Sequence, residues 1–559
     1  MKKFIYISGI MIGNIALFSS CLKDLDTVPL DKDSNASEKI YADPANYKNV
    51  LAKCYLGLAT GGQGGDGGGD ANSDISGIDG GFSQYTRQYW YHQEFSTDEA
   101  VVAWNDQTIK DFHYQTWSSS DVFVSAMYYR IMFQVTMTNE FIKNTMPNML
   151  DDRGIGGEYR ADFAVYQAEA RFLRALSYWH GIDLFRNVPF LTENDPIGAT
   201  FPKQINAKEL FSYIESELID ITDGVGSNDL KDAGTNEYAR ADKAAAWMLL
   251  AKLYLNSEVY IGVKNYEKAI AVLDKIIAAG YTLEPLHTNL FRTDNHNSNE
   301  IIFPIPFDGI GTQTWGGTTI LVHAAIGGSM GEGFDLEGKK VDSTLQRFGV
   351  GSGWGGFRTT KEFVQKFEVK DYDASDNTKP ISWLDNRAVF YSEGQNLEIE
   401  NVGLFTDGYA VPKFLNISST GVPGLDVDFT DTDLPMFRLA DAYLMYAEAN
   451  LRGGGGSADL ALQYVNALRE RAYGDNSGNI TSAELTLQFI LDERGRELMW
   501  EGHRRTDLIR FDQFTGEAYL WEWKGLLKQG AKTESYRDIF PIPANDLNAN
   551  PNLVQNPGY

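Results

Sequence analysis

Residues 244–280 read AAAWMLLAKLYLNSEVYIGVKNYEKAIAVLDKIIAAG, and they carry the strongest architectural signal in the chain. Apolar side chains recur at three- and four-residue intervals in both halves, which is the period of an amphipathic helix. The first half contains Trp247, Leu250, Ala251 and Tyr254; the second contains Tyr266, Ala269 and Leu273. We therefore predict two helices that pack together as a hairpin.

The spacing W-x2-L-small-x2-Y in the first half is that of a tetratricopeptide first helix, although the loop that follows is longer than the consensus. A second helical pair is predicted at 439–451 and 458–471, joined by the glycines at 453–456, and residues 161–180 also have helical spacing. The predicted fold is mainly α, a tetratricopeptide-like scaffold of helical hairpins. Because the hairpins are not contiguous, the segments between them must serve another purpose.

Residues 281–430 have a different character. They are rich in glycine and loops, with short strand-like runs at 300–306 and 318–326, so we predict a partly β insert region. Residues 61–81 form a second irregular segment, dense in glycine and aspartate. Long irregular segments on a rigid scaffold commonly carry binding sites. We expect the functional site in these two segments.

The N-terminus predicts export and lipid anchoring. Lys2 and Lys3 precede an apolar run at 5–17, and small residues lead to Cys21, the pattern of a bacterial lipoprotein signal. The run is too short to span a bilayer as a mature helix. Acyl chains on Cys21 would instead hold the protein at a membrane surface. An ordinary secretory signal cut nearby is the alternative.

The charge balance excludes several partners. The chain has 76 acidic and 49 basic residues and a formal net charge of −27 at pH 7, whereas nucleic acids and anionic lipids require clustered Lys and Arg. Acylation of Cys21 would leave Cys54 as the remaining cysteine, so an intramolecular disulfide is excluded. We expect Cys54 to be buried in a helix around residues 46–58.

Several longer motifs resemble the SusD/RagB family of glycan-binding lipoproteins of the Bacteroidetes outer membrane. They are RFLRALSYW at 171–179, DLFRNVPF at 183–190, FRLADAYLMYAEA at 437–449, DERGRELMWEGHRRTDLIR at 492–510, and the terminal PIP at 541–543 with NPNLVQNPGY at 550–559. The resemblance covers nearly the whole chain. It implies four tetratricopeptide-like units, no enzyme activity, and a partner, a SusC-like TonB-dependent outer-membrane transporter over which the lipoprotein sits as a hinged lid. It also implies that the protein faces the cell exterior.

The resemblance suggests a division of the chain into five parts. These are a signal peptide (1–20), a lipidated tether (21–38), an N-terminal helical region (39–280) with glycan-contacting loops at about 61–117, a loop-rich glycan-binding region (281–430), and a C-terminal helical region (431–559) that closes the scaffold.

The segments 240–247, 260–262, 316–319 and 431–435 are particularly similar to the starch-binding prototype of the family. By local matching, the prototype's glycan site implies five binding residues here: Trp104, Trp315, Trp354, Arg87 and Gln107. Aromatic rings cover the C–H face of a sugar, and fixed polar groups bind its hydroxyl rim. Trp315 stands where the prototype has tyrosine, Gln107 where it has asparagine, and Val102 where it has a further tryptophan. These differences leave the identity of the glycan open.

The prototype's calcium site implies Asp431 and Asp433 as ligands here, with Asp294 nearby. His296 replaces an expected third carboxylate, and imidazole is a poor ligand for calcium, which prefers oxygen. A solvated acidic turn is the alternative. No cofactor is required by the expected function, and a structural calcium ion is the single metal considered.

Two patterns that suggest catalysis have simpler explanations. The stretch GGSMG at 327–331 matches G-x-S-x-G, but the residues after it do not open a helix as a nucleophile elbow requires. Asp492 and Glu493 resemble a glycosidase acid pair, yet they lie among Arg494 and Arg496, so structural ion pairing is expected.

The sequence thus predicts a non-catalytic surface lipoprotein that captures oligosaccharides, most simply a starch-type α-glucan, for a transporter. A β-glucan such as laminarin, or levan, is the alternative ligand. A glycosidase would need two carboxylates beside the aromatic rings, and a purely structural repeat protein would need no such rings.

Overall fold

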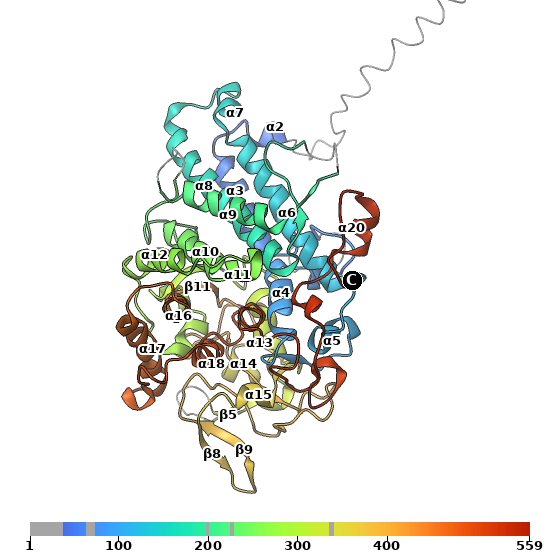
Figure 1. Ribbon diagram of the computed structural model, residues 1–559, viewed down its shortest axis with the longest axis vertical. Helices are drawn as coiled ribbons and strands as arrows, with labels where there is room; N and C mark the ends of the chain where they lie inside the picture. The colour runs from blue at the N-terminus through green and yellow to red at the C-terminus, as the bar shows by residue number, and fades with distance from the viewer. Residues whose placement is uncertain (1–36, 63–72, 197–200, 224–228, 335–339) are drawn as a thin grey trace, which may run out of the picture.

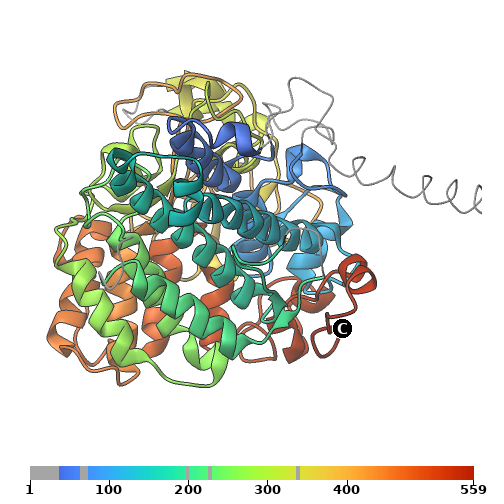
Figure 2. The ribbon, with the colours of Figure 1, turned by 90° about the horizontal axis from the view of Figure 1, so that it is seen from above.

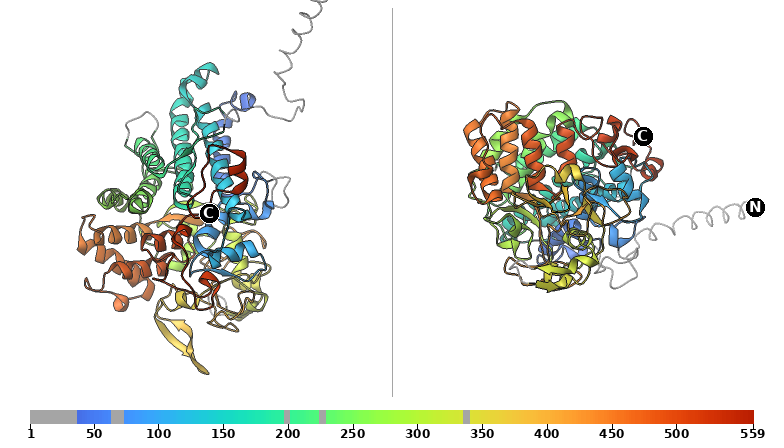
Figure 3. Two further views of the ribbon diagram at one scale, coloured as in Figure 1. Left: turned by 45° about the vertical axis from the view of Figure 1, so that its right-hand side comes forward. Right: turned by 90° about the horizontal axis from the view of Figure 1, so that it is seen from below.

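The computed structural model describes residues 37–62, 73–196, 201–223, 229–334 and 340–559, and helices dominate it. The long helices α6 (Val122–Asn144) and α8 (Arg160–Leu184) pack against each other and against α3 (Asn46–Ala59). They rise above the rest of the molecule in Figures 1 and 3. Cys54 is fully buried on α3, as predicted, and burial raises the pKa of its thiol to about 12.

The stretch 244–280 forms the predicted hairpin. Helix α10 (Lys243–Leu255) packs against α12 (Tyr266–Ile277), with the short α11 (Ser257–Ile261) in the longer connection between them. Helix α12 also packs on α16 (Leu439–Leu451), which in turn packs on α17 (Ala458–Tyr473). Figure 2 shows these green and orange helices side by side. The prediction of a mainly α, tetratricopeptide-like fold is therefore confirmed, and the stack is continuous in space although it is interrupted in sequence.

The insert region between α12 and α16 begins and ends near two strands that pair with each other. Strand β4 (Ile301–Ile305), the predicted run at 300–306, pairs antiparallel with β11 (Leu434–Arg438). The strand expected at 318–326 is wrong, because that segment forms helix α13 (Gly317–Ala324). Every residue of α13 is buried, and a short run that is buried on all sides has no exposed polar face whose period would separate strand from helix.

The insert also contains a projecting hairpin, β8 (Val369–Asp373) with β9 (Asp376–Trp383), seen at the lower end of Figure 1. A small antiparallel sheet joins three distant segments in the order β1 (Val101–Val102), β7 (Phe357–Thr359) and β10 (Tyr409–Ala410). The remaining main elements are α4 (Tyr85–Trp90), α5 (Gln107–Tyr114), α9 (Ala207–Asp220), α15 (Lys361–Val364), α18 (Leu487–Leu498), α19 (Arg504–Arg510) and α20 (Ala544–Ala549).

A buried network of ion pairs surrounds α18. Its Glu497 accepts from Arg438 at 2.7 Å, from Arg387 at 2.9 Å, and from Arg471. Arg438 ends β11 and also binds Glu300 and Glu501 at 2.7 and 2.6 Å. Burial alone would raise the pKa of Glu497, but these guanidiniums hold it well below its usual range. The network thus joins the insert, the α16–α17 pair and the C-terminal helices.

Residues 1–36 and 63–72 lie outside the described part of the chain, and with them the predicted signal, Cys21, the tether up to Ala36 and the middle of the loop 61–81. Among the described residues, no helix combines the length and apolar character needed to cross a bilayer.

We expect Arg438→Met to lower the free energy of unfolding by about 3–5 kcal/mol, because it leaves three buried carboxylates short of their shared cation. Urea denaturation followed by circular dichroism would measure the change. The matched control is Arg160→Met, which breaks the Arg160–Asp151 pair, in which the Asp151 side chain is 71% exposed. This control should cost less than about 1 kcal/mol. Equal costs for the two variants would contradict the role given to the network.

Candidate ligand-binding groove

The sheet β1–β7–β10 brings together two tryptophans that are 250 residues apart. Val102 pairs with Phe357, and the ladder continues as the Ala103 amide donates to the Gly356 carbonyl at 2.8 Å. Trp104 follows β1 directly, and its Nε1 donates to the Trp354 carbonyl at 3.3 Å. A Cβ on Gly356 would lie 2.6 Å from the Trp104 ring, so this position requires glycine. Strand pairing therefore fixes both rings.

Trp315 joins them from the loop before α13. Its carbonyl accepts from Nη1 of Arg87 at 2.8 Å, which ties the loop to α4. The chain then turns into α13 at Gly317, where φ is +53° and a Cβ would lie 2.0 Å from the Phe307 ring. The Trp354 amide donates to the His323 carbonyl at the end of α13. Helix α13 thus links the second and third rings.

The three half-buried indoles line one groove of about 600 Å³. The ring centroids of Trp104 and Trp354 are 6.5 Å apart with planes tilted by 46°, and those of Trp315 and Trp354 are 5.8 Å apart with a tilt of 55°. The other lining residues are Asp79, Gly81, Phe82, Arg87 and Asp106. The predicted rings and Arg87 therefore meet in space, and their successive tilts make a curved apolar surface.

Arg87 is held rigidly at one wall. Its Nη1 also donates to the Gly81 carbonyl at 2.7 Å, its Nε donates to the Tyr91 hydroxyl at 2.9 Å, and its guanidinium lies 4.4 Å from the Phe82 ring centroid. Only 4% of the residue is exposed. Its Nη2 makes no hydrogen bond to the described residues, so a donor remains for a ligand.

Gln107 is not among the residues that line the groove. It is exposed at the start of α5, and its amide donates to Asp111 at 2.8 Å. Two carboxylates line the groove instead, Asp79 and Asp106, which the sequence analysis missed. Asp106 lies two residues after Trp104, and this spacing from a predicted ring was the available signal.

The three predicted calcium ligands, Asp431, Asp433 and Asp294, each accept hydrogen bonds from other residues of the chain. Asp431 accepts from the Gly309 and Leu425 amides, each at 2.7 Å, and Asp294 accepts from the amide and hydroxyl of Ser419. Asp433 accepts from the Phe307 amide and the Tyr238 hydroxyl, and burial raises its pKa to about 6. No group of three metal-ligating side chains occurs in the described ranges. The carboxylates are occupied in tying loops together.

The full chain can now be compared with known proteins. It is 34% identical to the starch-binding protein SusD of Bacteroides thetaiotaomicron, with 97% of this chain and 96% of that protein aligned. The chain belongs to the SusD family. The SusD family model itself matches residues 385–559, which include α16 to α20.

Solved structures show the same fold at lower identity. A SusD superfamily protein from Parabacteroides distasonis has a TM-score of 0.65 at 20% identity, covering 94% of this chain and all of that one. Surface glycan-binding protein A from Bacteroides thetaiotaomicron, solved with laminarihexaose, has a TM-score of 0.63 at 20% identity, covering 92% and 99%.

The other tryptophans support the groove from below or lie elsewhere. Trp179, Trp500 and Trp521 are buried, and Trp247 is half-buried beside Lys275. Trp90 is also buried and stacks on Phe357 at 5.1 Å, which in turn contacts Trp104 at 5.2 Å. Tyr91 is buried as well, and Trp523 donates to the Ile399 carbonyl.

The patterns that suggest catalysis have structural roles, as expected. Glu493 binds Arg387 and Arg469 at 2.8 and 3.0 Å, and Asp492 binds Lys366 at 2.8 Å. After 327–331 the chain enters strand β5 (Glu332–Phe334), so it lacks the helix of a nucleophile elbow.

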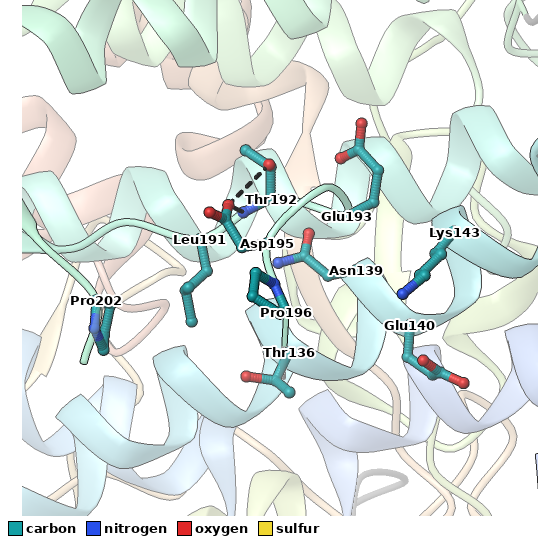
Figure 4. Close-up of a pocket in the computed structure, with 10 residues that line it drawn as sticks. All are labelled: Thr136, Asn139, Glu140, Lys143, Leu191, Thr192, Glu193, Asp195, Pro196 and Pro202. Atoms are coloured by element: carbon teal, nitrogen blue, oxygen red, sulfur yellow. Dashed lines mark hydrogen bonds between the residues drawn. The ribbon is translucent and has the colours of Figure 1, made fainter. Parts of the chain in front are cut away.

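A second pocket of about 200 Å³ lies between α6 and residues 191–196, with Pro202 also in its lining (Figure 4). Its lining includes Glu140, Lys143 and Asp195, which accepts from the Thr192 hydroxyl at 2.9 Å. None of the described residues that line it is aromatic, so it lacks a surface on which a sugar ring could stack.

Two buried carboxyl groups, Glu94 and Glu99, lie between Arg87 and Trp104 in the sequence. Glu94 accepts from the Gly502 and His503 amides at 2.7 and 3.2 Å, and Glu99 accepts from the Trp500 amide at 2.8 Å. Burial raises the pKa of Glu94 to about 7; burial and the charge of Glu94 raise that of Glu99 well above its usual range. The pair joins the segment that carries Arg87 and Trp104 to the end of α18.

We expect the Glu94 carboxyl to stabilise the fold most at acidic pH. Its folded pKa exceeds the ordinary value of 4.5, so the folded state binds the proton more tightly, and this stability is lost as the pH rises from about 4.5 to about 7. The difference in unfolding free energy between wild type and Glu94→Gln should therefore fall by roughly 1–3 kcal/mol over that range. Urea titrations at several pH values would measure it, and parallel pH profiles would contradict the assignment.

Proposed function

We propose that this protein binds an oligosaccharide in the groove formed by Trp104, Trp315 and Trp354, without cleaving it, and delivers it to a TonB-dependent outer-membrane transporter. The observation that carries the proposal is the convergence of three half-exposed indoles from distant segments on one groove. Indole faces at a surface would normally be unfavourable, and they suit the C–H faces of sugar rings. Arg87 offers a fixed donor to the hydroxyl rim.

The curvature of the groove favours a curved glycan. Because successive ring planes are tilted by 46° and 55°, a flat, ribbon-like chain could stack on one indole but not on all three. Starch-type α-glucans coil, and the relative that is 34% identical is named as starch-binding, so we propose an α-glucan. Laminarin, a coiled β-glucan, is the second candidate, because a structural neighbour was solved with laminarihexaose. Levan is a third glycan to be tested.

The groove does contain two carboxylates, which raises glycoside hydrolysis as the competing function. A glycosidase needs one carboxylic acid kept protonated by an apolar enclosure and a second carboxylate across the scissile bond. Asp79 and Asp106 are both exposed, and Asp79 already accepts from the Gly81 amide at 2.7 Å. Neither is enclosed as a general acid requires. We therefore propose a binding role and expect no reducing ends to be released from a bound glycan.

The proposed location follows from the N-terminal sequence and the family. Lipidation of Cys21 would anchor the protein in the outer membrane, facing the cell exterior, with residues 21–38 as the tether. The proposed division then gives a helical region (39–280), a loop-rich glycan-binding region (281–430) and a closing helical region (431–559). A SusC-like transporter would be the partner that receives the glycan.

We expect Trp104→Ala, Trp315→Ala and Trp354→Ala each to weaken glycan binding about tenfold or more, since each removes roughly 1–3 kcal/mol of stacking contact. Isothermal titration with maltoheptaose, laminarin and levan oligosaccharides would measure this. Tyr372→Ala is the matched control, because it removes an aromatic ring, 50% exposed, from the β8–β9 hairpin. If all three groove variants bind as wild type does, the proposed site is wrong. Binding of laminarin alone by wild type would leave the site standing but exclude the α-glucan.

We expect Cys21→Ala to release the protein from the outer membrane, because acyl chains supply most of the anchoring energy. Fractionation of cells that lack the transporter would test this, with wild type as the control. Retention of the variant in the membrane fraction would contradict the anchor.

A further inference from the structure

The aromatic groove has an acidic rim. Asp79 and Asp106 line it, both are exposed, and neither forms an ion pair with a Lys or Arg of the described residues. Two other acidic side chains of the same part of the chain do have cationic partners: Asp74 faces Arg130 and Lys53, and Asp98 binds Arg504 at 2.8 Å. The two rim carboxylates are therefore available to a ligand.

Their geometry leaves acceptor atoms free. Asp79 uses Oδ1 to accept from the Gly81 amide, which fixes the side chain beside the Arg87 wall, and Oδ2 has no partner among the described residues. Asp106 precedes α5, but its side chain does not cap the helix. Neither of its carboxylate oxygens accepts a hydrogen bond from the described residues. Asp106 lines the same groove as Arg87, whose Nε donates to the Tyr91 hydroxyl.

The positive charge of Arg87 does not neutralise the two carboxylates of the rim. The Arg87 residue is only 4% exposed and its guanidinium lies against the Phe82 and Tyr91 rings, whereas the two carboxylate residues are exposed. The three groups sum to one negative charge, on a chain with a formal net charge of −27. An anionic ligand would thus be repelled on approach and desolvated beside a like charge on binding. A neutral polyol would instead donate hydroxyl hydrogens to both carboxylates, which form stronger hydrogen bonds than neutral acceptors.

We propose that Asp79 and Asp106 make the groove selective for neutral, hydroxyl-rich glycans and against sulfated or uronic-acid glycans. This inference rests on the proposed function and names the substrate class of the same site. The rings bind any sugar face of suitable curvature, and the rim carboxylates reject the charged ones. Such a division of roles is specificity by repulsion as well as attraction.

The test uses the full mature protein, the neutral glycan that wild type prefers among maltoheptaose, laminarin and levan oligosaccharides, and a sulfated preparation of that same glycan. Asp79→Asn, Asp106→Asn and the double variant keep the side-chain shape and remove the charge. Asp152→Asn, an exposed position on α7 (Pro147–Asp152), is the control for the change of one net charge in each single variant. Isothermal titration at low and high salt would give each affinity, and melting temperatures would show that every variant is folded.

We expect the double variant to bind the neutral glycan about tenfold more weakly and to lower the ratio of neutral to sulfated affinity at least tenfold. Wild-type affinity for the sulfated glycan should rise with salt, because salt screens the repulsion, and this dependence should be smaller in the double variant. Asp152→Asn should match wild type. If wild type binds the neutral glycan through the three tryptophans but the double variant keeps the same ratio, the inference alone is overturned. If wild type binds no neutral glycan, the proposed function fails and the inference fails with it.

Discussion

The burial of charged side chains around α18 is the constraint on which the rest of the molecule depends. Glu497 and Glu493 are fully buried, and each needs several guanidiniums around it because an unpaired buried carboxylate is very unfavourable. These cations come from Arg387 in the insert, Arg438 at the end of β11, and Arg471 on α17. Segments far apart in the chain must therefore assemble together, or leave charges unpaired.

The ion-pair network around α18 also holds the groove rigid. After α18 the chain passes through Trp500, whose amide and indole both donate to Glu99 and whose carbonyl accepts from Trp90. Trp90 stacks on Phe357, and Phe357 packs under Trp104. A continuous line of buried contacts thus connects the ion-pair network to the first ring of the groove. Fixed rings lose little conformational entropy on binding, which makes stacking on a mobile glycan effective.

Sequence reasoning predicted the scaffold well because helices of this length carry their periodicity in the chain. Helix α16 has the bounds expected, and α10 and α12 form the hairpin that their spacing indicated. The strand predicted at 318–326 was wrong because a fully buried run has no exposed polar face to show its period. That Trp104 and Trp354 lie close together could be expected only from the family resemblance. Their proximity depends on pairing between strands of two and three residues. No local pattern marks such short strands.

The local sequence also does not show which polar residues line the groove. Gln107 and Asp106 are adjacent in sequence, and which of them lines the groove depends on the angle at which α5 begins. The acidic turn at 431–433 suggested a metal, because a sequence does not show that backbone amides and Tyr238 already occupy its carboxylates. The resemblance named three rings that the structure brings to one groove, and three carboxylates that accept hydrogen bonds from loop amides and hydroxyls.

A crystal structure of the mature protein soaked with maltoheptaose, or with laminarihexaose if that is the tighter ligand, tests the central claim most directly. The account predicts electron density for sugar rings across Trp104, Trp315 and Trp354, with hydroxyls within hydrogen-bonding distance of Arg87 and of Asp79 or Asp106. Sugar bound elsewhere on the molecule, with these three indoles left uncovered, would contradict it.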